Sequence, residues 1–324
     1  MKNVHALKRG FHWSPEDQDL GIYVNGVQVA SYSEKAGRDY YVNNITGAST
    51  NDGRSWGSAF DQVSTAITAS EAYRAEGGGA PTVTTNDYVR NRIFVQGTGT
   101  TYTYIAALPS YCDVYGVGAD PRGDGTGIVV LGDAAGSYDG AAGSMRGTNI
   151  YNIQFVGAST KYAMDLAVAY RSVIENCTFG GNASSAACAI GLNVVSGSGL
   201  TVRNCANIAH AAFPVIGFCF ASAGGNFNQC LVEDNMVYGS TTGMSNAGYL
   251  SNLTLFRNNV AYGGTTGISD TSANTGDGAL AFYWKNFGSG ATTGMTMTNS
   301  PERHCMDNYS VSNATSAVYY ALGA

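Results

Sequence analysis

The second half of the chain repeats one short pattern, and this repeat limits the choice of fold more than any other feature. The pattern reads apolar, exposed, Asn or Asp, small residue or Asn, any residue, apolar. Copies begin at Ile150, Ile174, Val202, Val232 and Phe256, with weaker copies at Tyr283 and Cys305. The fourth positions fall at residues 153, 177, 205, 235, 259, 286 and 308, so the steps are 24, 28, 30, 24, 27 and 22 residues. Self-similarity at such a period indicates a repeat architecture.

A period of 22 to 30 residues, built from short strands and Gly, Asn and Ser turns, fits one turn of a parallel β-solenoid. Each coil would stack on the next at about 4.8 Å, so like residues should form columns. The first position is apolar in all seven copies, which predicts an inward-facing column. The leucine pattern of leucine-rich repeats and a helical period of about 3.6 residues are both missing here.

The third position predicts a row of turns. Asn tolerates the left-handed backbone conformation, and its amide can bond to the coils above and below. We therefore predict a structural ladder formed by Asn152, Asn176, Asn204, Asp234, Asn258 and Asp307. The second position reads Tyr151, Glu175, Arg203, Glu233, Arg257, Trp284 and Met306. Its middle four residues alternate in charge, as an exposed ladder on adjacent strands should.

The residues before the repeat fit the same architecture. Short β-rich runs at 93–95, 114–117 and 128–131 are expected to be early coils. One helix is predicted over 58–76, because Ser58 and Asp61 form a capping-box-like start and residues 77–79 are all glycine. Phe60, Val63, Ile67 and Tyr73 would lie on its buried face. Such a helix would cover the open end of the solenoid.

Residues 40–60 carry a further series of motifs, in the order Tyr-Tyr-Val, Gly, Asn-Asp-Gly, Ser-Trp and Ala-Phe. The residues are Tyr40, Tyr41, Val42, Gly47, Asn51, Asp52, Gly53, Ser55, Trp56, Ala59 and Phe60. This series resembles the N-terminal cap of the pectin-lyase-like β-helix family, and with the coils the resemblance covers about residues 39–320. It implies an all-β, right-handed, single-stranded parallel β-helix with an N-terminal capping α-helix. Because the family includes lyases, glycoside hydrolases, epimerases, phage tailspikes and capsid-associated proteins, the resemblance implies fold rather than function.

Three segments are expected along the chain. Residues 39–80 would form the capping strand and helix, and residues 81–324 the coils. Residues 1–38 lie outside the resemblance and alternate around Asn25-Gly26, a strong hairpin signal. We interpret this arm either as an attachment or oligomerisation element or as a strand pair packed on the first coils.

Charge and composition exclude several classes of function. The net charge is −6 and no Lys/Arg cluster is present, which argues against a nucleic-acid partner. No apolar run reaches the roughly 18 to 20 residues of a membrane helix, and the first residues contain no apolar signal region. We therefore expect synthesis in a host cytoplasm without a signal peptide. The seven cysteines form no CxxC pair, so buried free thiols are expected, with Cys177 and Cys205 stacked.

Candidate catalytic residues are few. Hydrolysis of pectin-like substrates would need paired carboxylates with a nearby His and an Arg-x-Lys, yet the chain has no Asp-Asp pair, Gly-His-Gly or Arg-x-Lys. Glu175, Glu233 and Asp234 remain as weak candidates. The two glutamates share a column about 9 to 10 Å apart, near the spacing of inverting glycosidases. Arg203 lies between them and would keep both ionised, so we interpret them as part of the exposed ladder.

The other acidic residues and the histidines show no site geometry. Asp165, Asp234, Asp277 and Asp307 are scattered, and His5, His12, His210 and His304 are interpreted as structural. The loop 120–125 and the segment from Asp270 to Asp277 are candidates for calcium, but neither matches an EF-hand or RTX spacing. We therefore expect no cofactor and no metal.

Two functions from different classes remain. The first is a bacteriophage virion structural protein, a spike, head fibre or capsid-decoration protein at the virion surface. It would be a homotrimer, contact other virion proteins through residues 1–38 and have cell-surface polysaccharide as an external partner. The alternative is a polysaccharide-degrading depolymerase, lyase or glycoside hydrolase on the same fold. The missing catalytic constellation favours the non-enzymatic protein.

Overall fold

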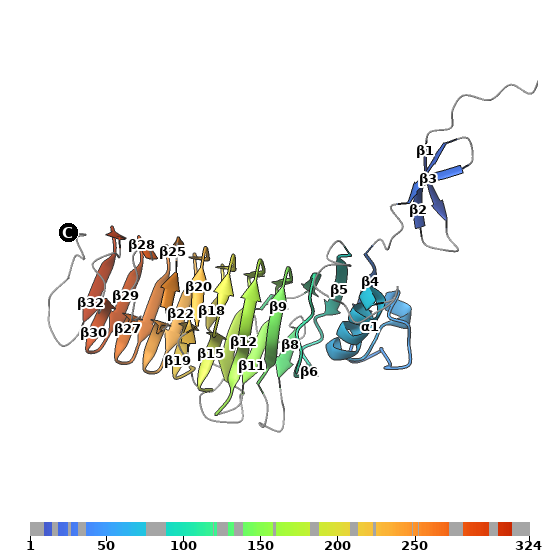
Figure 1. The fold of residues 1–324 in the computed structure, drawn as a ribbon. Coiled ribbons are helices and arrows are strands. Elements are labelled where there is room, and N and C mark those ends of the chain that lie inside the picture. The colour runs from blue at the N-terminus through green and yellow to red at the C-terminus, as the bar shows by residue number, and fades with distance from the viewer. Residues whose placement is uncertain are drawn as a thin grey trace, which may run out of the picture.

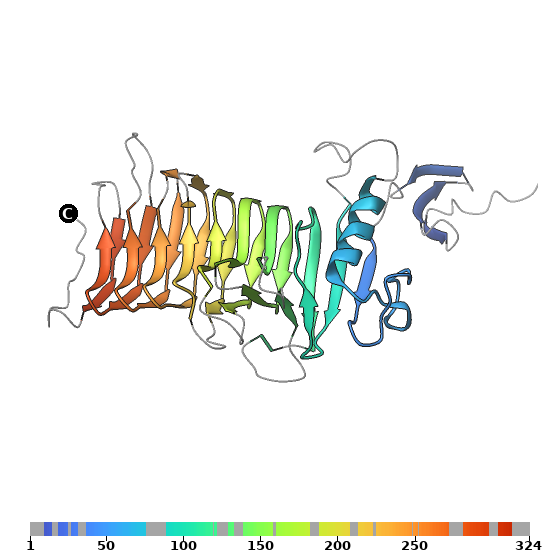
Figure 2. The same cartoon turned by 90° about the horizontal axis from the view of Figure 1, so that it is seen from below.

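The computed structural model is a parallel β-helix closed at one end by a helix (Figure 1 and Figure 2). It describes residues 10–14, 19–24, 27–31, 37–75, 89–118, 120–121, 129–132, 139–157, 160–181, 188–207, 213–222, 225–247, 249–251, 253–271, 281–297 and 304–312. The parallel β-solenoid predicted from the repeat, and the right-handed parallel β-helix that the resemblance implies, are confirmed.

Three parallel sheets run along the axis. Sheet I has ten strands: β4 (Asp39–Val42), β5 (Asn91–Gln96), β7 (Cys112–Val117), β10 (Asn149–Tyr151), β13 (Val173–Glu175), β17 (Thr201–Arg203), β21 (Leu231–Glu233), β25 (Thr254–Arg257), β28 (Ala281–Trp284) and β31 (His304–Met306). Sheet II has nine: β6 (Thr101–Thr103), β8 (Val130–Gly132), β11 (Gln154–Gly157), β14 (Thr178–Gly181), β18 (Ala206–Asn207), β22 (Met236–Gly239), β26 (Val260–Gly263), β29 (Phe287–Gly290) and β32 (Tyr309–Ser312).

From β9 onward, sheet III connects sheet II to the next strand of sheet I. Its strands are β9 (Ala141–Arg146), β12 (Tyr162–Tyr170), β15 (Ile190–Val194), β16 (Gly197–Ser198), β19 (Ile216–Phe220), β20 (Asn226–Asn228), β23 (Thr242–Asn246), β24 (Tyr249–Ser251), β27 (Thr266–Asp270) and β30 (Thr293–Met297). The long strand β12 pairs with both β15 and β16, which follow one another in the next coil.

The apolar core lies inside the three sheets, and the first position of the repeat supplies one of its columns. Ile150, Ile174, Val202, Val232, Phe256 and Tyr283 are paired in register and almost completely buried. The column begins earlier than the repeat indicated, since Tyr40, Ile93 and Val114 precede Ile150 in the same register. Aromatic pairs add to this packing, with the Phe256 and Tyr283 rings stacked at 4.8 Å.

A second interior column was not predicted. At the fourth position of the repeat, Asn235, Asn259, Asn286 and Asn308 are buried one above the other. The Asn235 amide donates to Asn259 Oδ1 at 2.9 Å, Asn259 donates to Asn286 Oδ1 at 2.9 Å, and Asn286 donates to Asn308 Oδ1 at 3.0 Å. Each amide also donates to a backbone carbonyl of the preceding coil, as Asn259 does to Val232 at 2.9 Å. We call these four residues the interior amide ladder.

The capping helix is shorter than predicted. A 3-10 turn at Trp56–Ser58, capped by Ser55, precedes α1, which covers Val63–Ala75. The predicted start at Ser58 is wrong because Phe60 pairs with Val42 of β4 as an isolated parallel bridge, which holds this segment extended. The predicted buried residues Phe60, Val63, Ile67 and Tyr73 are buried. The predicted glycine end lies outside the described residues.

Helix α1 packs across the end of sheet I (Figure 2). The Tyr40 hydroxyl of β4 donates to the Ala69 carbonyl at 3.2 Å. The Asn91 amide of β5 donates to the Ser70 carbonyl and hydroxyl, and all of Asn91 is buried. These bonds satisfy polar groups that the first strands would otherwise leave buried without partners.

The N-terminal arm contains a small antiparallel sheet of β1 (Gly10–Ser14), β2 (Asp19–Val24) and β3 (Val27–Ser31). Strands β2 and β3 pair with Val24 opposite Val27, which is the hairpin register expected around residues 25 and 26. Strand β1 adds an antiparallel edge, with Gly10 opposite Tyr23.

Candidate functional site

The outer face of sheet I carries one continuous column of side chains. In register from β4 to β31 it consists of Tyr41, Phe94, Tyr115, Tyr151, Glu175, Arg203, Glu233, Arg257, Trp284 and Met306. Its last seven members are the second position of the sequence repeat. The column therefore changes from aromatic to charged and back to apolar along the axis.

The aromatic part of the column is a stack of rings. Ring centroids are 5.5 Å apart for Tyr41 and Phe94, 5.5 Å for Phe94 and Tyr115, and 4.9 Å for Tyr115 and Tyr151. Trp56 closes the far end with an edge contact to Tyr41 at 4.9 Å. Burial, followed by the charge of Asp113, raises the pKa of both Tyr115 and Tyr151, so their hydroxyls are neutral donors over the physiological range.

The charged part of the column forms two separate ion pairs. Arg203 donates to Glu175 at 2.8 Å, and Arg257 Nε donates to Glu233 at 2.5 Å. The expectation that Arg203 bonds both glutamates is therefore corrected: Glu233 is bound by the arginine of the following coil. Arg257 can bind Glu233 because the alternation of charge along the column continues for one more coil.

The turn beside this column is formed by the third position of the repeat. Asn152, Asn176, Asn204, Asp234, Asn258, Lys285 and Asp307 all have φ between 52° and 58°. The Asn176 amide donates to Asn152 Oδ1 at 2.7 Å, and the Asn258 amide donates to Asp234 Oδ1 at 3.2 Å. The left-handed conformation costs Asn little free energy, which explains why the third position favours Asn.

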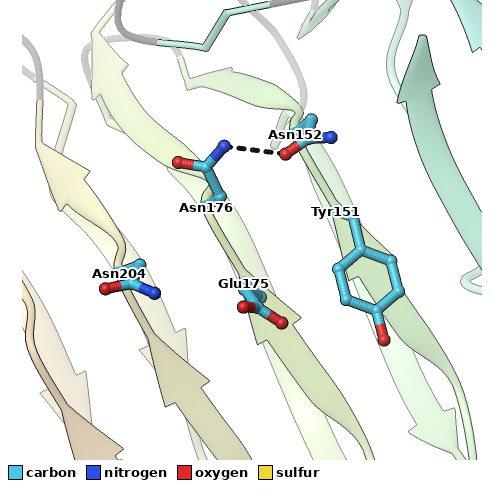
Figure 3. Close-up of a pocket in the computed structure, with 5 residues that line it drawn as sticks. All are labelled: Tyr151, Asn152, Glu175, Asn176 and Asn204. Carbon is cyan, nitrogen blue, oxygen red and sulfur yellow. Dashed lines mark hydrogen bonds between the residues drawn. The ribbon is translucent and has the colours of Figure 1, made fainter.

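A polar pocket lies where the column and the turn row meet (Figure 3). It has a volume of about 440 Å³ and is lined by Tyr151, Asn152, Glu175, Asn176 and Asn204, from three successive coils. Figure 3 shows Tyr151 and Glu175 on neighbouring strands, with the three asparagines along the adjacent turn. The pocket thus combines a phenol hydroxyl, three amides and a carboxylate that is already paired with Arg203.

The structure brings some predicted site residues together and separates others. Glu175 lies in the pocket with three members of the predicted ladder. Glu233 and Asp234 lie two coils beyond Glu175, and Asn258 and Asp307 lie further along the turn row. Tyr151 is the pocket residue that sequence reasoning did not select, although the repeat placed it in the same column as Glu175.

The remaining acidic candidates lie away from this pocket. Asp165 is on sheet III, where the Asn193 amide donates to it at 2.7 Å and burial raises its pKa. Asp270 is fully buried and accepts a bond from the Tyr283 hydroxyl at 2.7 Å. Asp277 and Asp124, needed for the two calcium candidates, lie outside the described residues, as do His5 and His210. Among the described residues, no group of three His, Cys, Asp or Glu side chains is placed to hold a metal.

The cysteines within the core are protected thiols. Cys177 and Cys205 are fully buried, and burial raises the pKa of Cys177 well above its ordinary value. Burial also raises the pKa of Cys112, Cys188 and Cys230 to about 12 and that of Cys219 to about 11. Such thiols are poor nucleophiles at neutral pH, so they add no reactive group to the site.

Comparisons with known proteins add little about function. No protein-family model matches the chain, and no curated protein matches it. Among solved structures, a pectin methylesterase from Aspergillus niger matches with 14% sequence identity and a TM-score of 0.36, over 81% of this chain and 90% of that chain. A likeness at this level carries no conclusion about activity. In the part of the chain that the structure describes, no helix is long and apolar enough to cross a membrane.

Proposed function

We propose that this protein is a carbohydrate-binding β-helical structural protein rather than an enzyme, and that it is displayed on the surface of a bacteriophage particle. The observation that carries the binding proposal is the polar pocket of Tyr151, Asn152, Glu175, Asn176 and Asn204. It offers hydrogen-bond donors and acceptors in fixed positions on a rigid sheet.

The chemistry of the pocket fits a neutral, hydroxyl-rich ligand. Amide side chains both donate and accept, and so match sugar hydroxyls, which do the same. The charge of Glu175 is offset by Arg203 at 2.8 Å, so the site has no excess charge to select an ionic ligand. The stacked rings of Tyr115 and Tyr151 supply an apolar border against which the C–H groups of a sugar can pack.

The carboxylate geometry favours binding over glycoside hydrolysis. An inverting glycosidase places one acid and one base about 6.5 to 9.5 Å apart with space for a water between them. Here Arg203 occupies the strand between Glu175 and Glu233, and each glutamate is held by its own arginine. Each carboxylate is thus already engaged by a guanidinium group, and the two glutamates do not form an acid and base pair that face a shared water.

Display on a virion is supported by the resemblance of residues 40–75 to the cap of β-helix proteins that include phage spikes. A chain with only 12% charged residues and many Tyr, Ser, Thr and Asn side chains suits adhesion through hydrogen bonds. In this proposal, residues 1–38 contact other virion proteins. Mass spectrometry of purified particles, with immunogold labelling against this chain, tests the location; labelling confined to the lysate contradicts it.

Binding can be tested by calorimetry on a panel of neutral and acidic oligosaccharides. Asn176→Gly removes one pocket amide and retains a residue suited to φ 52°. We expect it to weaken binding of a neutral oligosaccharide about 5- to 10-fold, the value of one net hydrogen bond. Asn258→Gly makes the same change at φ 53° outside the pocket and should leave affinity unchanged. Equal loss in both variants would contradict the pocket.

Catalysis is tested on the same panel. The wild-type protein should release no reducing ends and no unsaturated products from any oligosaccharide that it binds. If turnover is found, the polysaccharide-degrading alternative holds, and Glu175→Gln and Glu233→Gln identify the residue responsible. A rate that is unchanged in one variant removes that glutamate from the mechanism.

A further inference from the structure

The aromatic part of the outer column on sheet I continues directly from the polar pocket toward the capping helix. Tyr151, which lines the pocket, is the last ring of a stack that runs through Tyr115, Phe94 and Tyr41 on the preceding strands. Trp56 contacts the Tyr41 ring at the far end of this stack. We call Trp56, Tyr41, Phe94 and Tyr115 the aromatic track, and it shares one wall, Tyr151, with the pocket.

The rings of the track lie on the outside of the sheet and are open to solvent. Tyr41, Phe94 and Tyr115 are each half-buried, whereas the neighbouring residues Val42 and Val95 point into the core and are completely buried. Trp56 is 40% exposed. A single exposed aromatic residue is ordinary, but several in contact form a continuous apolar surface of the kind that marks an interaction site.

Polar side chains run beside the rings, and their charges cancel in pairs. Arg92 donates to both carboxylate oxygens of Asp39, at 2.7 and 2.8 Å, and Arg90 Nε donates to Asp113 at 2.8 Å. The two arginine side chains are 54% and 40% exposed, respectively. Gln96 lies on the same outward face of β5 as Arg92. The track therefore combines an apolar strip with hydrogen-bonding groups and, like the pocket, has no excess charge.

We propose that the pocket and the aromatic track together bind one linear polysaccharide, with its chain laid along the axis of the β-helix. This inference rests on the carbohydrate-binding function proposed above and adds the class of carbohydrate. The rings offer apolar edges to the C–H groups of successive sugars, and the polar side chains beside them can bond to hydroxyls. An extended peptide fits this surface less well, because it would pair with an open sheet edge, and the track lies on a sheet face.

The register of the strands determines how long the bound chain must be. Five strand-to-strand steps separate Tyr41 from Arg203, which precedes the pocket residue Asn204. At about 4.8 Å for each step, the pocket and the track span about 24 Å. A short oligosaccharide can therefore fill the pocket without reaching most of the rings. Only a longer chain contacts both, so affinity should increase with chain length.

The test is calorimetry of the full chain with neutral oligosaccharides of one linear series, from disaccharides to chains that span about 24 Å. We expect the longest chains to bind about 10-fold more tightly than a chain that fills only the pocket. Phe94→Thr removes the central ring and keeps a β-branched residue suited to a strand. It should weaken binding of the longest chains about 3- to 10-fold, the value of one aromatic contact, and leave binding of the shortest binding chain unchanged.

Two further variants give the control and a safeguard. Trp284→Thr removes a ring from the same column, but beyond the Glu233–Arg257 pair, and should leave the affinity at every chain length unchanged. Trp56→Ala changes an exposed residue outside the three sheets. It should weaken only the longest chains, and it decides the question by itself if Phe94→Thr does not fold.

The outcomes separate this inference from the function on which it rests. If no oligosaccharide of any length binds, the carbohydrate-binding function itself is wrong. If short chains bind, lose affinity in Asn176→Gly, and bind as tightly as long chains, the pocket stands and the aromatic track is overturned. Equal long-chain affinity in the wild type and in the folded track variants also overturns it, as does an equal loss in Trp284→Thr.

Discussion

The early and the late coils of this β-helix place chemically different side chains at the same interior position. At the fourth position of the repeat, the earlier coils have Ile153, Cys177 and Cys205, and the later coils have the interior amide ladder. The Cys205 thiol donates weakly to the Ile174 carbonyl at 3.6 Å, while Asn235 donates to the equivalent Val202 carbonyl at 3.1 Å. One backbone geometry thus accepts either a small, weakly polar thiol or an amide that bonds in two directions.

This difference matters because buried thiols and buried amides lose their stabilising effect under different conditions. A thiol contributes apolar burial and a weak bond, and it ionises at high pH. An amide contributes several stronger bonds and does not titrate, but its neighbours depend on it for their own hydrogen bonds. The early coils should therefore be sensitive to alkali, and the late coils to a single substitution.

Raising the pH should produce the largest effect, and in the part of the chain before the interior amide ladder, which contains four further buried thiols outside the fourth position. Cys112, Cys188 and Cys230 have a folded pKa of about 12 and Cys219 about 11, whereas an unfolded thiol titrates near ~8.5. Above that value the unfolded chain releases protons that the folded chain retains. Stability should therefore be full below pH ~8.5 and should fall as the pH rises from there toward the folded pKa values, by about 1 kcal/mol per thiol per pH unit, or on the order of 4 to 6 kcal/mol per unit for these four.

Urea unfolding at pH 8 and pH 10 measures the total loss. Hydrogen exchange at the same two pH values, corrected for intrinsic rates, should show opening first in residues 112–230. If residues 254–312 open first instead, the prediction that alkali destabilises the early coils is wrong.

Asn259→Leu should have the next largest effect, and in the late coils. Leucine cannot donate to the Val232 carbonyl or accept from the Asn235 backbone and amide, so buried groups on both sides lose a partner. At about 1 to 3 kcal/mol for each such group, the free energy of unfolding should fall by about 4 kcal/mol. Asn258→Gly, at the exposed neighbouring residue, should cost less than about 1 kcal/mol in the same urea titration. Similar losses in the two variants would show that the ladder is energetically unimportant.

Cys205→Ala should have the smallest effect of the three. It removes one buried sulfur and a weak bond, at a cost of about 1 to 2 kcal/mol. The comparison requires this loss to stay below that of Asn259→Leu under identical conditions. A larger loss for the cysteine would mean that packing, and not hydrogen bonding, controls the fourth position.

Much of the fold could be predicted from the sequence because stacking repeats the same requirement in every coil. The inward first column, the left-handed third position and the alternating Glu175–Arg257 column each leave a regular trace, and the structure has all three in one register. The Asn at four successive fourth positions was equally visible. A buried amide is costly unless it is paired, however, and the partners here are other copies of the same residue, which become visible only once the coils are stacked.

Other features depend on contacts that the sequence pattern does not encode. The helix begins at Val63 because a tertiary bridge between Val42 and Phe60 overrides the local capping signal. The pocket depends on how the turn row lies beside Tyr151 and Glu175, although each lining residue belonged to a recognised column. Which glutamate pairs with which arginine is likewise decided by side-chain placement within a regular ladder.

The strict register of the columns also makes the length of this molecule adjustable in whole steps. Asn235 and Asn259 are equivalent and 24 residues apart, so duplicating or deleting one such block joins like residues to like in every row. The far end of the β-helix would move by about 4.8 Å, and each face would keep the same kinds of side chain in its rows. A deletion of one residue, in contrast, would turn inward-facing side chains outward. The length of the fold can therefore change only by whole coils, and insertions and deletions are tolerated only when they add or remove a complete coil.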